Sequence, residues 1–132
     1  MSDDAQAAPW WRSAVVYQLY LKSFLDTDGD GIGDLDGVLE RLDHIAALGV
    51  DGVWFNPCYP SPQRDGGYDV ADYLTIDPVY GGLPAFERFL EAAHARGLKV
   101  LLDLVPNHCS DQHPLFQKAL AAEPGSAARR RF

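Results

Sequence analysis

The chain has few cysteines and few basic residues among its 132 residues. Its two cysteines, Cys58 and Cys109, lie far apart and lack the spacing of metal ligands, which argues against a disulfide framework and a cysteine-based zinc site. With 11 Lys and Arg against 19 Asp and Glu, the formal net charge is −8, and no basic stripe follows any expected element. This balance argues against a nucleic-acid partner.

Long apolar runs are also missing. No stretch approaches the roughly 18 apolar residues of a transmembrane helix, and the opening residues, Met1 to Asp4, are acidic and lack the apolar core of a signal peptide. We therefore expect a cytoplasmic protein with reduced thiols and no membrane contact.

What the sequence does contain is a regular alternation of apolar patterns. Short runs rich in β-branched and aromatic residues predict strands, and apolar residues at three- and four-residue spacing predict helices. The expected strands cover residues 15–21, 52–56 and 99–105, and the expected helices cover 35–48, 83–93 and 114–122. Strands that alternate with helices in this way predict an α/β fold with a parallel sheet.

Two parallel architectures compete for this pattern. A doubly wound nucleotide-binding sheet would carry a glycine fingerprint after its first strand, but Gly29, Gly31 and Gly33 alternate here with aspartates, which would repel a phosphate. A (β/α)8 TIM barrel gathers its functional loops at the carboxyl ends of its strands, where the polar loops of this chain lie. We prefer the barrel. Because a barrel usually needs about 250 residues, residues 1–132 are expected to be its N-terminal portion, about three βα units, without the remainder of the barrel and later domains.

The loop after the first expected strand, DTDGDGIGD, concentrates carboxylates. Alternate aspartates with glycines between them can converge on one hard cation. The loop also matches the first seven positions of an EF-hand, which adds a backbone carbonyl at position seven, although position twelve is Gly37 and not glutamate. A structural Ca²⁺ or Mg²⁺ site is favoured over a solvated acidic turn, with Asp26, Asp28, Asp30, Asp34 and the carbonyl of Ile32 as ligands.

Two further loops carry groups suited to a sugar. The third expected strand runs into Pro106, Asn107 and His108, and the segment SPQRDGGYDVADY places aspartates among tyrosines. Carboxylates accept hydroxyl protons and aromatic rings stack on pyranose faces, so this composition is compatible with a neutral polyhydroxylated ligand. The alternative is a tyrosine-rich loop whose aspartates cap turns.

Five ordered segments together resemble the opening of an α-amylase-superfamily glycoside hydrolase, family 13, and within it the α-glucosidase and oligo-1,6-glucosidase branch. The segments are WWRSAVVYQLY at 10–20, DGDGIGDLDGV at 28–38, LDHIAALGVDGVW at 42–54, SPQRDGGYDVADY at 61–73 and DLVPNH at 103–108. The resemblance implies cation binding by the first acidic loop. It also implies that Asp65 binds hydroxyls of a terminal glucosyl unit, that Tyr68 stacks on it and that His108 donates to it, with Asp103 and Asn107 supporting the site.

The resemblance further implies a retaining mechanism with two carboxylates, which in the family follow the fourth and fifth strands. We therefore expect no catalytic residue in this chain, which alone should be inactive. Asp103 is expected within its strand and not at the tip, while Cys58 and Cys109 are both expected at the catalytic rim. The implied substrates are α-glucosidic oligosaccharides such as maltose or isomaltose, with no organic cofactor and with the rest of the barrel as partner. A trehalose synthase or other α-glucosyltransferase or isomerase, and a non-catalytic binding fragment, stay open as alternatives.

Overall fold

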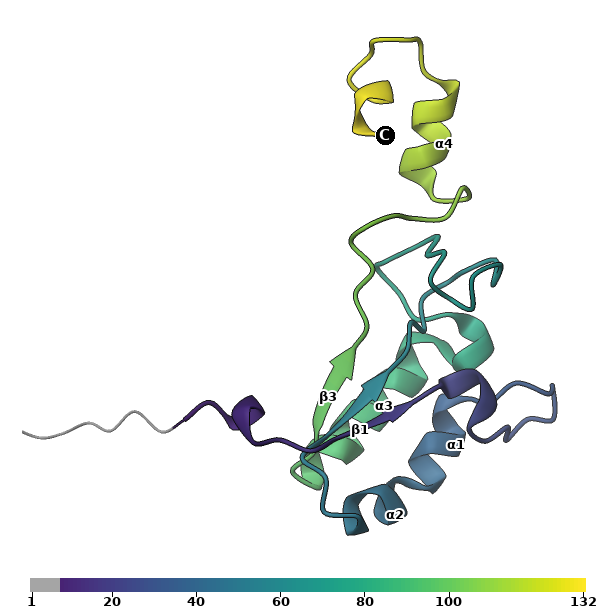
Figure 1. Cartoon of the computed structure of the whole chain (residues 1–132). Helices are drawn as coiled ribbons and strands as arrows, with labels where there is room; N and C mark the ends of the chain where they lie inside the picture. Colours follow the sequence, from purple (N-terminus) through teal and green to yellow (C-terminus); the bar gives the residue numbers. More distant parts are fainter. Residues whose placement is uncertain (1–7) are drawn as a thin grey trace, which may run out of the picture.

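A computed structural model describes residues 8–132, so the acidic opening at Met1 to Asp4 lies outside the described residues. Three strands form one parallel sheet in the order β1-β2-β3, with β1 at Val16–Leu19, β2 at Gly52–Phe55 and β3 at Lys99–Leu102 (Figure 1). Val16, Gly52 and Lys99 are in register at one end. The predicted strands are confirmed, although each is shorter than the apolar run that predicted it.

Helices α1 at Leu35–Glu40, α2 at Leu42–Ala47, α3 at Gly82–Ala95 and α4 at Pro114–Ala121 follow the predicted order. The expected single helix over 35–48 is wrong in one respect, because a tight turn interrupts it where the Arg41 N–H donates to the Val38 carbonyl at 3.1 Å. Short 3₁₀ helices complete the elements at Trp10–Arg12, Leu21–Ser23, Pro78–Tyr80 and Arg129–Arg131. Among residues 8–132, no helix is long and apolar enough to span a bilayer.

The core lies between one face of the sheet and helices α1 and α3. Phe55 on β2 meets Phe89 on α3 edge to face, with ring centroids 5.0 Å apart, and Leu35 and Val38 of α1 are completely buried beside them. Because side chains alternate along a strand, the residues between those of the core point to the opposite face. The helices therefore cover one face of the sheet and leave the other open.

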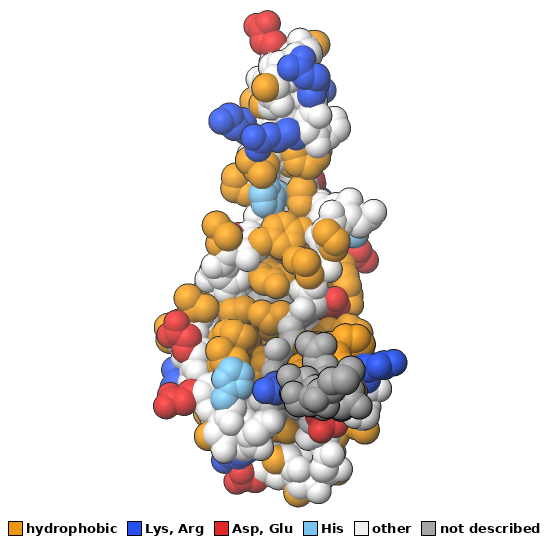
Figure 2. Space-filling model, turned by 90° about the vertical axis from the view of Figure 1, so that its left-hand side faces the viewer, with side chains coloured by type: hydrophobic (Ala, Val, Ile, Leu, Met, Phe, Trp, Pro, Cys, Tyr) orange, Lys and Arg blue, Asp and Glu red, His pale blue; other side chains and the backbone are white. Residues whose placement is uncertain are grey.

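The open face carries Gln18, Trp54 and Leu101, which are in register across the three strands. Trp54 is 37% exposed, and hydrophobic side chains extend over this side of the molecule toward α4 (Figure 2). Beyond β3 the chain leads to α4 and the C-terminal turn, which stand apart from the sheet (Figure 1). A parallel sheet covered on one face only is the arrangement expected for part of a barrel.

Gly37 marks a close approach between α1 and the segment before the acidic loop. A Cβ added there would lie 2.2 Å from the Leu25 carbonyl oxygen and 2.9 Å from the Leu25 Cβ. We expect Gly37→Ala to lower the free energy of unfolding by about 2–3 kcal/mol because the backbones must separate. Gly49→Ala is the control: Gly49 has φ +75° with nothing within 4 Å of an added Cβ, so only about 1 kcal/mol of backbone strain is expected. Urea unfolding compares the two, and equal losses would contradict the close contact.

Candidate functional site

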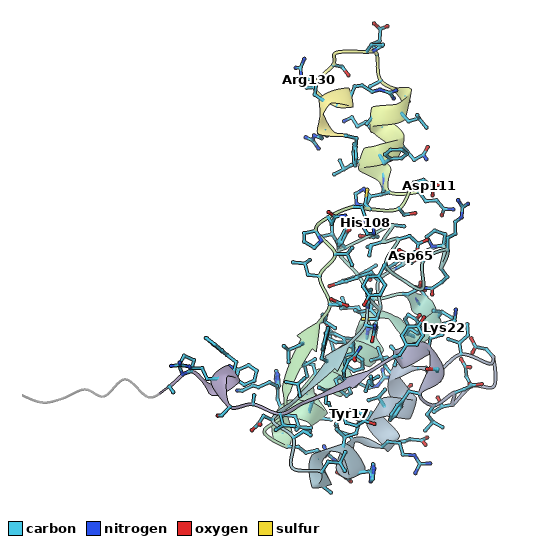
Figure 3. All side chains as sticks on the ribbon, in the orientation of Figure 1. Tyr17, Lys22, Asp65, His108, Asp111 and Arg130 are labelled. Carbon is cyan, nitrogen blue, oxygen red and sulfur yellow. The ribbon has the colours of Figure 1, made fainter. Side chains whose placement is uncertain are left out.

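The candidate site lies beyond the carboxyl ends of the strands, where the loops after β2 and β3 meet. Figure 3 shows Asp65 and His108 together at this rim. β3 ends at Leu102, so Asp103 follows the strand directly and stands at its tip. The expectation that Asp103 lies midway in a strand is therefore wrong, because the ladder to β2 ends where β2 itself ends, at Phe55.

Tyr68 is held by a row of polar side chains: Gln18 lies in β1, and Asn56 and Asp103 directly follow β2 and β3. Its hydroxyl donates to Asp103 Oδ2 at 2.8 Å and accepts from Asn56 Nδ2 at 3.1 Å. The carbonyl oxygen of the Asn56 side chain in turn accepts from Gln18 Nε2 at 2.7 Å. The hydrogen bond to the Asp103 carboxylate raises the pKa of the Tyr68 phenol, because the neutral phenol is the donor.

Gln18 and Asn56 were not among the residues expected from the sequence. A usable signal was present: Gln18 is the one polar residue in the apolar run VVYQLYL, and Asn56 ends the apolar run GVWF. A lone polar side chain in an apolar strand is a candidate for a hydrogen bond to a partner beside it in the sheet, as the exposed Gln18 makes here to Asn56. The identity of that partner depends on the register between strands, which the sequence pattern does not give.

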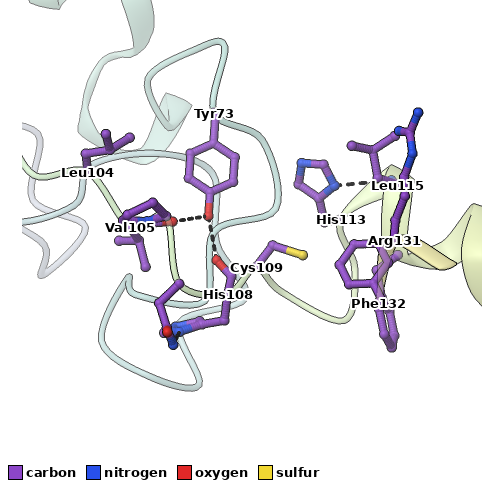
Figure 4. A pocket seen from close by; sticks show the side chains of 12 residues that line it. Tyr73, Leu104, Val105, His108, Cys109, His113, Leu115, Arg131 and Phe132 are labelled. Atoms are coloured by element: carbon purple, nitrogen blue, oxygen red, sulfur yellow. Dashed lines mark hydrogen bonds between the residues drawn. The ribbon is translucent and has the colours of Figure 1, made fainter.

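His108 is oriented by two neighbours. Its Nε2 lies 3.1 Å from the backbone carbonyl oxygen of Tyr68, and its Nδ1 lies 3.1 Å from Asn107 Nδ2. Because a carbonyl only accepts and the amide nitrogen only donates, the neutral ring must carry its proton on Nε2. The Tyr73 hydroxyl oxygen lies 2.8 Å from the His108 carbonyl oxygen and 2.7 Å from that of Val105, which fixes the backbone at this point (Figure 4).

Asp65 and Asp69 lie close together but make different contacts. The Asp69 carboxylate accepts hydrogen bonds from Ser61 Oγ at 2.6 Å and from the backbone N–H groups of Arg64 and Asp65 at 2.9 and 3.3 Å. Burial alone would raise the pKa of Asp69, but these hydrogen bonds hold it below its usual range. The exposed Asp65 carboxylate has no hydrogen bond within residues 8–132. Asp69 therefore shapes the loop, whereas the Asp65 carboxylate is free of such contacts among the described residues.

The acidic loop brings three of its four aspartates together. Carboxylate oxygens of Asp26, Asp28 and Asp34 lie within 4.8 Å of one another, whereas Asp30 is outside this group and accepts from the Ile32 N–H at 2.7 Å. Hydrogen bonds from the Gly29 and Gly31 N–H groups lower the pKa of Asp26, so it is ionised at neutral pH. The oxygen-only donor set fits a hard divalent cation. Asp30 and the Ile32 carbonyl stay predicted ligands.

The two cysteines, both expected at the rim, differ in access. Cys58 is 1% exposed, and burial raises the pKa of its thiol to about 12. Cys109 is partly exposed and lines a cavity of about 560 Å³ beside Tyr73 and His108 (Figure 4).

We expect iodoacetamide to modify Cys109 under native conditions and to leave Cys58 unmodified until urea unfolds the chain, because the reagent needs an accessible thiolate. Peptide mass spectrometry assigns the modified thiol, and Cys109→Ser should abolish native labelling. Native labelling of Cys58 at a comparable rate would contradict the buried position.

Comparison with known proteins identifies the family of this chain. The family model of the alpha amylase catalytic domain matches residues 18–130. The chain belongs to the alpha-amylase family. A probable alpha-glucosidase of Rhizobium meliloti (strain 1021) is 50% identical over 119 residues, which are 90% of this chain and 22% of that protein. An oligo-1,6-glucosidase of Heyndrickxia coagulans is 53% identical over 107 residues, which are 81% of this chain and 19% of the enzyme.

Among solved structures, a mutant of trehalulose synthase MutB superposes with a TM-score of 0.84 at 47% identity, over 89% of this chain and 21% of that one. This α/β chain therefore has the fold of the first part of a (β/α)8 barrel, as predicted, and the doubly wound alternative is wrong. The chain spans about one fifth of the length of the relatives it matches.

Proposed function

We propose that this chain forms the first part of the catalytic domain of a retaining α-glucosidase, which hydrolyses terminal α-linked glucose from short oligosaccharides such as maltose or isomaltose. The observation that carries the proposal is the meeting of Tyr68, Asp103 and His108, with the exposed Asp65 in the same region (Figure 3), at the rim where barrels of this kind bind substrates. A pocket of this composition suits one pyranose, with hydroxyls for Asp65 and His108 and an apolar ring face for Tyr68.

The chemical steps of a retaining glycosidase need two catalytic carboxylates, whereas the roles proposed here for Asp65 and Asp103 are binding and support. Retaining glycosidases use a carboxylate nucleophile and a carboxylic acid about 5–5.5 Å apart. Asp103 accepts a hydrogen bond from the Tyr68 hydroxyl and thereby helps to hold the ring. We expect the two catalytic carboxylates to come from later strands of the barrel, and the chain alone to be inactive. Its own residues would bind and orient the terminal sugar.

A glucosyl-transferring or isomerising enzyme of the same family is the second candidate. The likeness to trehalulose synthase favours it, since the present segment matches that enzyme about as well as it matches hydrolases. Hydrolysis and transfer differ in whether water or a sugar hydroxyl accepts the glucosyl unit, and that acceptor site would be formed by other parts of a barrel. A non-catalytic binding fragment is the third candidate.

A chimeric enzyme tests the proposal. The matching 107 residues of the Heyndrickxia coagulans oligo-1,6-glucosidase would be replaced by those of this chain. We expect the chimera to release p-nitrophenol from p-nitrophenyl α-glucoside, and residues 1–132 alone to release none. A folded chimera that lacks activity would contradict the proposal.

We propose in addition that Asp26, Asp28 and Asp34 bind a structural divalent cation, Ca²⁺ or Mg²⁺, with Asp30 and the Ile32 carbonyl completing the ligands. Three carboxylates within 4.8 Å support this, since their mutual repulsion needs a counter-charge. A cation at 100 times its dissociation constant should stabilise the fold by about 2.7 kcal/mol. Thermal unfolding with Ca²⁺, Mg²⁺ or EDTA measures the gain, which Asp28→Asn should abolish. Equal melting temperatures in Ca²⁺, Mg²⁺ and EDTA would contradict the site.

For the cellular location, we propose the cytoplasm. Free thiols at Cys58 and Cys109 support a reducing compartment. Fractionation of the native source, with detection by an antibody to this segment, tests the proposal, and recovery from the external medium would contradict it.

A further inference from the structure

Three polar side chains lie near the rim on the open face of the sheet, one in β1 and one directly after each of β2 and β3. Gln18 on β1 is in register with Trp54 on β2 and Leu101 on β3. Asn56 and Asp103 lie two residues beyond those partners, so the alternation of side chains puts all three polar groups on the same face. The three side chains form a diagonal row. Gln18 lies within β1, and Asn56 and Asp103 lie at the rim, directly after β2 and β3.

The hydrogen bonds in this row have one possible direction. The Gln18 amide donates to Asn56 Oδ1 at 2.7 Å, and this bond turns the NH₂ group of Asn56 toward Tyr68. Because the Tyr68 oxygen accepts from that NH₂ group, its single proton is free to point to Asp103, 2.8 Å away. The row ends on a carboxylate, which only accepts. Each donor therefore fixes the orientation of the next group.

The row also links a long loop to the sheet. Tyr68 stands in the long loop after β2, whereas Gln18 is in a strand and Asn56 directly follows one. The backbone carbonyl of Tyr68 is contacted separately by His108 Nε2 at 3.1 Å. Rotation of the phenol ring away from the rim would break its bonds to both Asn56 and Asp103. Without a sugar, the ring of Tyr68 is thus held by Asn56 and Asp103, and its backbone by His108.

We propose that Gln18 and Asn56 are positioning residues, which hold the Tyr68 ring in the one orientation that lets it stack on the terminal sugar. The proposal rests on the proposed function for the role of Tyr68, but the hydrogen-bond row is a property of this chain alone. Gln18 acts on Tyr68 through Asn56 and touches no sugar itself. Neither residue is a catalytic group.

The first experiment measures this coupling in the chain of 132 residues, with no sugar present. The ring resonances of Tyr68 are followed by carbon–proton NMR and assigned through their loss in Tyr68→Phe. Gln18→Met, which keeps the length of the side chain but cannot donate, should shift them. In an Asn56→Leu background the same substitution should shift them no further. Gln112→Met changes an exposed glutamine away from the row and serves as the control.

An equal effect of Gln18→Met with and without Asn56, or an effect no larger than that of Gln112→Met, would overturn the proposal. Gln18→Glu provides a second test of the proposal if Gln18→Met fails to fold. Its carboxylate accepts where glutamine donates, so it should reverse the Asn56 amide and thereby shift both the Asn56 NH₂ and the Tyr68 ring resonances. Unchanged Asn56 NH₂ resonances in Gln18→Glu would equally overturn the proposal.

The second experiment uses the active chimera with p-nitrophenyl α-glucoside. Loss of one neutral hydrogen bond corresponds to about a fivefold change, so Gln18→Met should raise KM about fivefold and leave kcat within about twofold. Binding lost equally from the ground state and the transition state gives this pattern. A fall in kcat at unchanged KM would overturn the positioning role. An inactive parent chimera would instead count against the proposed function, while the NMR result would stand.

Discussion

His108→Ala in the chimeric enzyme is expected to lower kcat/KM for p-nitrophenyl α-glucoside by about 10²–10³-fold, the usual loss for one oriented donor in a site of this kind. The imidazole is held by Asn107 and by the Tyr68 carbonyl, so its Nε2–H is directed before any substrate arrives. A sugar hydroxyl would take the place of that carbonyl as acceptor. Steady-state kinetics with the glucoside measure the loss.

His44→Ala is the matched control for this substitution. His44 is an exposed residue of α2, on the far side of the core from the rim, and its loss should leave kcat/KM within about twofold, as expected of a surface change. Circular dichroism and a thermal melt establish that both variants fold. If His108→Ala folds and keeps kcat/KM within threefold of the parent, His108 has no part in binding the sugar.

The parallel α/β fold could be predicted because strands and helices have different apolar periods, and a chain that alternates them has few packing solutions. The interruption at Arg41 could not be predicted, since Leu39 and Leu42 continue the helical spacing across it. The tight turn there depends on how α1 and α2 fit the core, which is a tertiary effect.

The candidate site was predictable as far as residue types specify chemistry. Tyr68, His108, Asp103 and Asn107 were expected together, and the structure brings them together through hydrogen bonds. The role of Asp69 could not be predicted, because Asp65 and Asp69 are the same residue type in the same loop. What separates them is that Asp69 points into its own loop and accepts three hydrogen bonds, a distinction made by loop geometry alone.

In the acidic loop, too, the residue types could be predicted but the individual contacts could not. Its alternation of aspartate and glycine predicted a gathering of carboxylates, and three of them gather. Alternation could not show that Asp34 also begins α1, where its carboxylate accepts from the Gly37 N–H at 2.7 Å. A residue that holds both a loop and a helix start contributes more to stability than its neighbours do.

Asp34→Ala is therefore expected to lower the free energy of unfolding by about 3 kcal/mol, measured by urea denaturation at pH 7 in EDTA. Asp34 is 6% exposed, and its carboxylate also accepts from the backbone N–H and the hydroxyl of Thr27, both at 2.8 Å. Loss of an N-cap costs about 1 kcal/mol, and hydrogen bonds to a charged group contribute about 1.5–3 kcal/mol. EDTA removes any contribution of a bound cation from the comparison.

The pH dependence distinguishes the carboxylate from simple packing. Burial would raise the pKa of Asp34, but the hydrogen bonds from Thr27 and Gly37 outweigh it and hold the pKa below its usual range. A lowered pKa in the folded state means that the carboxylate stabilises the fold above the ordinary aspartate pKa, near 3.9, and that this is lost as the pH falls through the folded-state pKa. Asp34→Asn should therefore flatten the fall in stability between about pH 4 and pH 2. Parallel pH curves for the parent and Asp34→Asn would mean that Asp34 acts by packing, because a carboxylate that binds donors only in the folded state has to lose that stabilisation when it is protonated.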